Sequence, residues 1–157
     1  MSKNIKFYIG VKALIMNNKN EILLLKAAPP ETRFEKEKVE FWDFPGGRVK
    51  EQADAEGVVR SATLEDTLIQ ECKEEIGAKS LQIDGIFHAV VSNFMIKDSA
   101  TEQTPLTLIV YRCKTNASQP IRLSHEHTEY KWFSPQQAKS LLKTKYPESF
   151  TEKLDKI

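Results

Sequence analysis

The sequence predicts an α/β protein, more strictly α+β, in which a mixed β-sheet is sandwiched between α-helices. Short apolar stretches with strand periodicity, segments with helix start and stop signals, and the interleaving of the two along the chain point to this class. The chain has 157 residues, and domains commonly contain about 100–200 residues. We therefore expect a single domain spanning residues 1–157.

The first part of the chain predicts two strands and a charged loop. Every odd position from 7 to 15 is apolar, which indicates a strand with one face more deeply buried than the face that carries Lys12. Residues 17–20 have turn chemistry and residues 22–25 are apolar, so an antiparallel hairpin is expected. Seven of the ten residues 31–40 are charged, which predicts a solvated loop or, alternatively, a lid over a neighbouring site.

The remaining elements follow in the same way. Residues 41–47 predict a short aromatic strand that ends in a turn, and residues 48–62 predict a loop. A helix is expected from Thr63, where Thr63 and Asp66 can cap the first turn, to Gly77. Residues 85–96 and 105–113 predict a second hairpin, and residues 130–133 a strand before a helix that opens at Ser134. A last helix is expected to bury the face that carries Phe150, Leu154 and Ile157.

The charge balance limits the classes of partner. Lys and Arg number 23 against 22 Asp and Glu, so no global field attracts nucleic acid or an acidic membrane. No stretch approaches the about 18 uninterrupted apolar residues that a membrane span needs. Cys72 and Cys113 lie in apolar sequence without metal-ligand spacing, which indicates reduced thiols. These observations favour a soluble, cytoplasmic protein with no membrane and no stable nucleic-acid partner.

The acidic helix is the segment that indicates chemistry. At about 100° per residue, Glu71, Glu74 and Glu75 share one sector that adjoins the apolar stripe of the helix. Such a run is ordinarily a solvated face, but carboxylates at the shoulder of a buried stripe repel one another with less screening. A hard divalent cation resolves that repulsion, and Mg²⁺ accepts oxygen ligands together with substrate phosphates. Three carboxylates near a Gly-Gly turn therefore indicate a magnesium–phosphate site.

These residues resemble the signature of the Nudix hydrolases, the MutT-like family. Phe-Pro-Gly-Gly ends at Gly47, and the helix reads Glu-x-x-Glu-Glu-x-Gly from Glu71 to Gly77. The stretch Glu-His-Thr-Glu-Tyr-Lys-Trp from residue 126, followed by a Ser-Pro helix, is also common in that family. The resemblance covers most of the chain and implies the Nudix fold, with a mixed sheet between helices.

The resemblance implies specific roles for these residues. Glu71, Glu74 and Glu75 would be catalytic ligands of Mg²⁺, with Mn²⁺ as a substitute, and Gly47 would supply a backbone carbonyl near the metal. Glu126 would complete the metal site or act as general base, with Glu129 as its rival. Lys26 and Arg48 stand where family members place cations against substrate phosphates, and either could instead be a surface charge. The expected partner is a small nucleotide substrate, and a homodimer is possible because family members are often dimers.

Two departures from the family pattern separate two functional hypotheses. The first box glutamate corresponds to Ala62 after a loop nine residues longer than usual, and the box arginine corresponds to Gln70. Gln70 can still donate a hydrogen bond, although without charge assistance. The first hypothesis is a pyrophosphohydrolase that cleaves a nucleoside diphosphate linked to another moiety. The alternative is a catalytically impaired module that binds a nucleotide or a protein. A zinc site at His125 and His127 is the weaker interpretation, because no third soft ligand is nearby.

Overall fold

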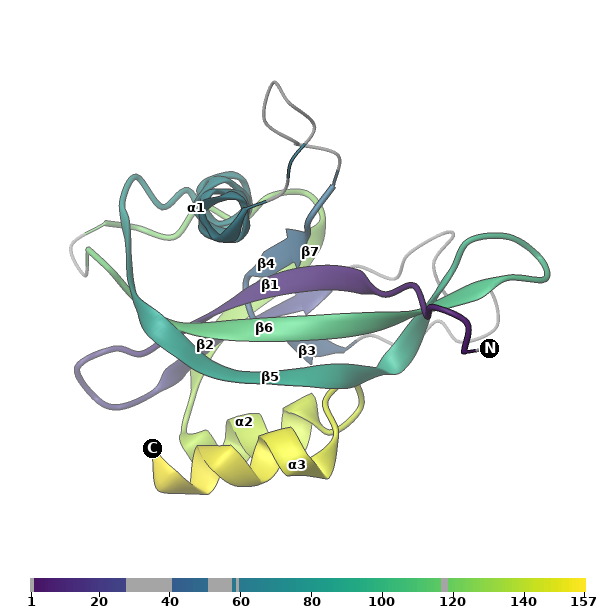
Figure 1. The fold of residues 1–157 in the computed structure, drawn as a ribbon. Coiled ribbons are helices and arrows are strands. Elements are labelled where there is room, and N and C mark those ends of the chain that lie inside the picture. The colour runs from purple at the N-terminus through teal and green to yellow at the C-terminus, as the bar shows by residue number, and fades with distance from the viewer. Residues whose placement is uncertain (1, 28–40, 51–57, 59, 117–118) are drawn as a thin grey trace.

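Two β-sheets form the centre of the molecule in the computed structural model, which describes residues 2–27, 41–50, 58, 60–116 and 119–157. The first sheet has the strand order β4-β1-β6-β5 and the second has the order β3-β2-β7. Helix α1 lies on one side of the sheets, and helices α2 and α3 lie on the other (Figure 1). The mixed sheet arrangement between helices confirms the predicted fold class.

The strand and helix bounds are as follows: β1 Tyr8–Ile15, β2 Ile22–Ala27, β3 Trp42–Asp43, β4 Gly46–Arg48, α1 Ser61–Ile76, β5 Leu81–Lys97, β6 Gln103–Thr115, β7 His127–Phe133, α2 Pro135–Leu142 and α3 Glu148–Thr151, which continues as a 3₁₀ turn over Glu152–Lys156. The predicted second hairpin is confirmed, because β5 and β6 pair antiparallel, and both strands are longer than expected. The charged segment 31–40 and most of the predicted loop 48–62 lie outside the described residues.

The predicted first hairpin is wrong. Strand β1 pairs parallel to β6 and antiparallel to β4, whereas β2 pairs with β3 and β7 in the other sheet. Among the described residues, the β-pairing between the two predicted strands is limited to one isolated antiparallel bridge, between Met16 and Ile22. Both strands are apolar on two faces, so each can lie at the centre of its own sheet, and local turn chemistry did not decide their pairing.

The core has two parts, one on each side of the sheets. On one side, Leu68 and Cys72 of α1 pack against the odd positions of β1, such as Val11. On the other side, Phe44 and Phe150 form the centre of a second cluster. Because the even positions of β1 also face a core, residues 10–15 are all buried. The expectation of a less buried face at Lys12 is therefore wrong, since that residue is only 8% exposed.

Helix α1 begins two residues before the predicted start. The hydroxyl of Thr63 accepts a 3.1 Å hydrogen bond from the backbone N–H of Arg60, so Thr63 acts from inside the first turn rather than as the cap. The helix ends as predicted at Gly77, which has φ 68° in the left-handed region. Helix α2 opens at Ser134, whose hydroxyl accepts a hydrogen bond from the backbone N–H of Gln137. No helix in the described part of the chain is long and apolar enough to cross a membrane.

Candidate active site

A tight turn between β3 and β4 approaches the acidic helix. The backbone N–H of Ala13 donates to the carbonyl of Pro45 at 2.8 Å, which holds the turn against β1. Gly46 has φ 143°, and a Cβ atom there would lie 2.0 Å from the carbonyl oxygen of Val11. Since a side chain is excluded at this position, Gly46 allows the backbone to approach both β1 and α1.

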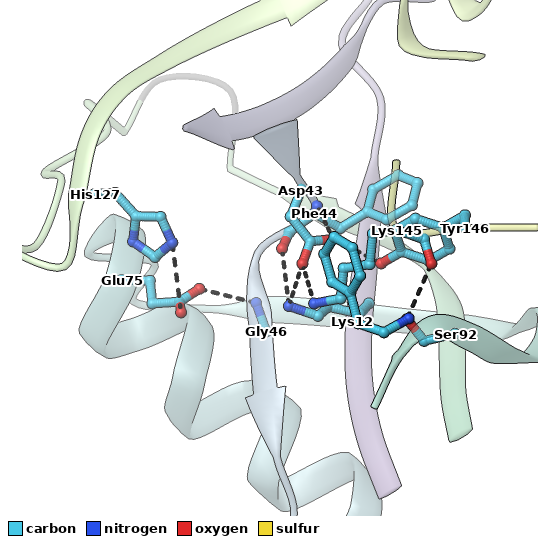
Figure 2. A network of polar contacts seen from close by, with 10 residues as sticks. Lys12, Asp43, Phe44, Gly46, Glu75, Ser92, His127, Lys145 and Tyr146 are labelled. Carbon is cyan, nitrogen blue, oxygen red and sulfur yellow. Dashed lines mark hydrogen bonds and ion pairs between the residues drawn. The ribbon is translucent and has the colours of Figure 1, made fainter. Parts of the chain in front are cut away.

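Glu75 is the most buried of the predicted carboxylates, with 6% of the residue exposed. Its Oε2 accepts a 2.8 Å hydrogen bond from the backbone N–H of Gly46, and its Oε1 lies 4.0 Å from Nε2 of His127. Figure 2 shows the Glu75 carboxylate between these two residues. Burial raises the pKa of Glu75 to about 7, with Glu71 adding to the shift, while Lys12 and the Gly46 N–H oppose it.

Glu71 lies against the next residue of the turn. A Cβ atom on Gly47 would fall 2.6–2.9 Å from the carboxylate of Glu71, so the glycine leaves the space that this carboxylate occupies. Burial raises the pKa of Glu71, and the charges of Glu74 and Glu126 add to it. The structure thus gathers these carboxylates closely enough to repel one another.

Glu74 is exposed and interacts with the residue that replaces the box arginine. The side-chain amide of Gln70 donates a 2.7 Å hydrogen bond to Oε1 of Glu74. The predicted amide hydrogen bond from Gln70 is therefore present. Ala62, at the position of the missing box glutamate, is exposed in the first turn of α1.

A cavity of about 320 Å³ lies beside this cluster, between the turn, β6 and the start of β7. Its wall combines acidic groups, cations and apolar side chains: Gly10, Lys12, Ala27, Phe41, Asp43, Gly46, Gly47, Arg48, Glu75, Phe94, Ile96, Leu106, Leu108, Glu126, His127 and Lys145. Of the predicted substrate cations, Arg48 therefore lies at the cavity. Of the two rival glutamates, Glu126 lines it as well.

Lys26 and Glu129 lie outside the lining of this cavity. They are register partners on β2 and β7, and the Lys26 ammonium lies 5.8 Å from the ring centroid of Trp42. A larger cavity of about 640 Å³ lies elsewhere, with Leu14, Cys113 and Trp132 in its wall. No predicted site residue is among the described residues of that wall.

Lys12, Asp43 and Lys145, which line the smaller cavity, belong to a buried ionic cluster that the sequence did not predict. Asp43 accepts hydrogen bonds from Lys145 Nζ and from the Tyr146 hydroxyl, both at 2.6 Å, and Lys12 Nζ lies 2.9 Å from the same carboxylate (Figure 2). Burial alone would raise the pKa of Asp43, but the two ammonium groups hold it well below its usual range. The sequence feature that could have predicted this cluster is Lys12, a lysine inside an otherwise apolar strand.

His127, which the sequence offered only as part of the weaker zinc interpretation, lies beside Glu75. Its Nε2 faces Glu75, while its Nδ1 is buried without a hydrogen-bond partner in the described part of the chain. Burial lowers the pKa of His127, and the nearby Lys12 charge lowers it further, so the imidazole is neutral at pH 7. His127 therefore places an uncharged imidazole ring beside the Glu75 carboxylate.

The donor set at the turn fits a hard divalent cation. Glu71, Glu74, Glu75 and Glu126 offer carboxylate oxygens, which such cations prefer, and the mutual repulsion that raises the pKa of Glu71 would be relieved by a cation. Among the described residues, the side chains as they stand do not form a closed group of three metal ligands. Of these four residues, Glu75 and Glu126 line the cavity.

Comparison with known proteins identifies the class. The NUDIX domain family model matches residues 6–154, so the chain belongs to the Nudix family. Its fold is similar to the MutT protein of Methanosarcina mazei Go1, at 27% identity and a TM-score of 0.67, over 99% of this chain and 95% of that one.

Two other solved structures share the fold at lower identity. An Ap4A hydrolase from C. elegans is 21% identical with a TM-score of 0.63, over 96% of this chain and 93% of that one. An E. coli dihydroneopterin triphosphate pyrophosphohydrolase is 17% identical with a TM-score of 0.61, over 95% and 93%. No curated protein sequence matches the chain.

Proposed function

We propose that the chain is a divalent-cation-dependent pyrophosphohydrolase that cleaves a nucleoside diphosphate linked to another moiety. The observation that carries the proposal is the placement of Glu75 and Glu71 against the Gly46–Gly47 turn at the mouth of a cavity. Membership of the Nudix family supports the same reaction class. The named relatives, an Ap4A hydrolase and a dihydroneopterin triphosphate pyrophosphohydrolase, act on substrates with phosphoanhydride bonds.

Glu71, Glu74 and Glu75 would hold Mg²⁺, or Mn²⁺ in its place. When bound, the cation would polarise a phosphoryl oxygen and lower the pKa of a coordinated water. The Gly46 N–H fixes one oxygen of Glu75, which leaves the other directed toward His127. Glu126, at the wall of the cavity, would accept the proton of the attacking water.

The rest of the cavity would bind the substrate. The guanidinium of Arg48 would offset charge on the polyphosphate, since cations at that position stabilise charge that develops in the transition state. Phe94, Ile96 and Leu106 also line the cavity and give that part of its surface an apolar character that suits a nucleoside. Lys26, outside the cavity lining, is a weaker candidate for a phosphate contact than Arg48.

Hydrolysis of a panel of nucleoside triphosphates, dinucleoside polyphosphates and nucleotide sugars tests the proposal. The assay uses Mg²⁺ and Mn²⁺ and compares wild type with the Glu74→Gln/Glu75→Gln double variant. Glu65→Gln is the matched control, because Glu65 is an exposed glutamate on the same helix. Turnover that the double variant loses and the control keeps supports the hydrolase.

The alternative, a binding module, is favoured by the two departures from the box, Ala62 at the position of the first glutamate and the neutral Gln70 at the position of the arginine. This alternative predicts no turnover on any compound with either metal. It also predicts thermal stabilisation by a nucleotide, because a ligand that binds only the folded state raises its apparent stability.

A further inference from the structure

Lys12 is an unusual residue for the middle of a buried strand. It is 8% exposed, and its ammonium contacts two parts of the turn, the Asp43 carboxylate at 2.9 Å and the carbonyl oxygen of Phe44 at 3.4 Å. Burial alone would lower the pKa of Lys12, but the charges of Asp43 and Glu75 raise it, so the side chain is an ammonium. A buried charge of this kind is costly unless it is paired, and here the turn supplies the pairing groups.

The aliphatic stem of Lys12 packs against the same turn between β3 and β4. A Cβ atom on Gly46 would lie 2.9 Å from Cα and 3.0 Å from Cδ of Lys12, so the Gly46 backbone lies close to both the backbone and the side-chain stem of Lys12. Gly46 and Lys12 are also register partners on β4 and β1. The residue that Lys12 supports is the one whose N–H donates to Glu75.

From these contacts we propose that Lys12 is a positioning residue for the catalytic carboxylate Glu75. Its ammonium fixes the turn through its contacts with Asp43 and Phe44, and its stem packs against Gly46. Together these contacts orient the Gly46 N–H toward Oε2 of Glu75. Lys12 also lines the cavity, but its ammonium is engaged by the carboxylate and the carbonyl, so we place its action in the turn. The kinetic test of this inference rests on the proposed function, whereas its structural test does not.

The ionic cluster supplies a matched pair of variants. Lys12→Met keeps most of the stem and removes the ammonium, while Asp43 remains paired with Lys145 and Tyr146. Tyr146→Phe removes a hydrogen bond to Oδ1 of the same carboxylate, whereas the Lys12 ammonium contacts Oδ2. Tyr146 does not line the cavity, so its variant tests the effect of weakening the cluster alone.

The first readout is the Gly46 amide resonance in ¹H–¹⁵N spectra, recorded without metal and without nucleotide. Lys12→Met is expected to shift that resonance and to speed hydrogen exchange of the amide, and Tyr146→Phe is expected to leave both unchanged. In the wild type, the Gly46 amide is expected to be protected from exchange. If Lys12→Met does not fold, the shorter neutral variant Lys12→Gln carries the same expectations.

The second readout is kinetic. Lys12→Met is expected to lower kcat about 10–100-fold, as loss of groups that orient metal ligands does. Its KM for the nucleotide is expected to stay within about threefold, because a positioning residue is not a substrate contact. Its activation constant for Mg²⁺ is expected to rise.

Three results would overturn the inference. They are an unchanged Gly46 resonance in Lys12→Met, an unprotected Gly46 amide in the wild type, and a Lys12→Met defect confined to KM, which would make Lys12 a substrate contact. Failure of the proposed function is a separate outcome. In that case no compound of the panel is hydrolysed, or Glu75→Gln leaves turnover intact, while the Gly46 resonance still reports whether Lys12 holds the turn.

Discussion

The backbone N–H of Gly46 donates a 2.8 Å hydrogen bond to Oε2 of Glu75, which joins two residues 29 positions apart in the sequence. The glycine comes from the turn between β3 and β4, and the glutamate from the last turn of α1. This contact connects the Phe-Pro-Gly-Gly turn, just before the opening glycine of the Nudix box, with the glutamate helix of the box. In this chain the contact holds the Gly-Gly turn against the helix of glutamates.

Gly46→Ala is expected to destabilise the fold strongly. Gly46 and Gly85 both have positive φ, 143° and 132°, but only at Gly46 would a Cβ atom meet backbone, at 2.0 Å from the Val11 carbonyl. Gly85→Ala, with no described atom within 4 Å, is therefore the control for backbone strain alone. Strain of that kind costs about 1–3 kcal/mol, and forced overlap adds about 1–3 kcal/mol more. Urea unfolding of both variants measures the difference, and equal losses would contradict the geometry.

Gly47→Ala is expected to affect activity more than stability. The new methyl group would displace the Glu71 carboxylate, which is the flexible end of a half-buried side chain. The free energy of unfolding should change by less than about 1 kcal/mol, while kcat should fall about 10–100-fold. In the Glu71→Gln background the same substitution should have little further effect, because its target is already altered. A full additive loss in the double variant would show that Gly47 acts elsewhere.

The ionic cluster predicts a specific dependence of stability on pH. Lys12 and Lys145 hold the pKa of Asp43 below its unfolded value, which is about 3.9. The stabilisation is therefore fully present above about pH 5 and is lost as the pH falls below the unfolded pKa.

The Asp43→Asn variant tests the direction of this pH dependence of stability. The variant leaves two buried ammonium groups without their carboxylate, so it should lose about 3–5 kcal/mol at pH 7. The loss should shrink as the pH is lowered from 5 to 3, measured by urea unfolding at each pH. Asp66→Asn, on the exposed side of α1, is the control that should lose little at either pH. A loss from Asp43→Asn that grows toward low pH would reverse the predicted sign.

Two adjacent residues on α1 test which face of the helix is buried. Leu68 is fully buried against β1 and β2, whereas Ile69 is 41% exposed. Leu68→Ala should cost about 2–5 kcal/mol, and Ile69→Ala should change stability by about 0.5 kcal/mol or less. Thermal unfolding of the two variants measures the contrast, and similar losses would mean that the helix is rotated from its described position.

Much of the fold followed from local patterns. The strand within residues 7–15, the helix stop at Gly77 and the Ser134 cap are local backbone choices, and the structure has all three, although the predicted difference between the two faces of that strand is absent. Strand partners did not follow, because the parallel pairing of β1 with β6 joins segments about 100 residues apart that no turn signal connects. The burial of Lys12 likewise depends on Asp43 and Lys145, which are distant in sequence and meet only in the folded chain.

The candidate site was likewise predictable where it depends on local structure and unpredictable where it depends on tertiary packing. The helical spacing of Glu71, Glu74 and Glu75 already predicted a shared sector, because a helix is a local structure. The contact of His127 with Glu75 depends on where the start of β7 crosses the end of α1, which is set by tertiary packing. For the same reason the sequence could not separate Arg48, at the cavity, from Lys26, outside its lining.

The most direct test of the central claim is the turnover of Glu75→Gln on the best substrate of the nucleotide panel, at saturating Mg²⁺ and with folding confirmed. If Glu75 is a catalytic carboxylate held by Gly46, kcat should fall by about 100-fold or more, while Glu65→Gln keeps the wild-type rate. A Glu75→Gln protein that hydrolyses the substrate at the wild-type rate would contradict the account.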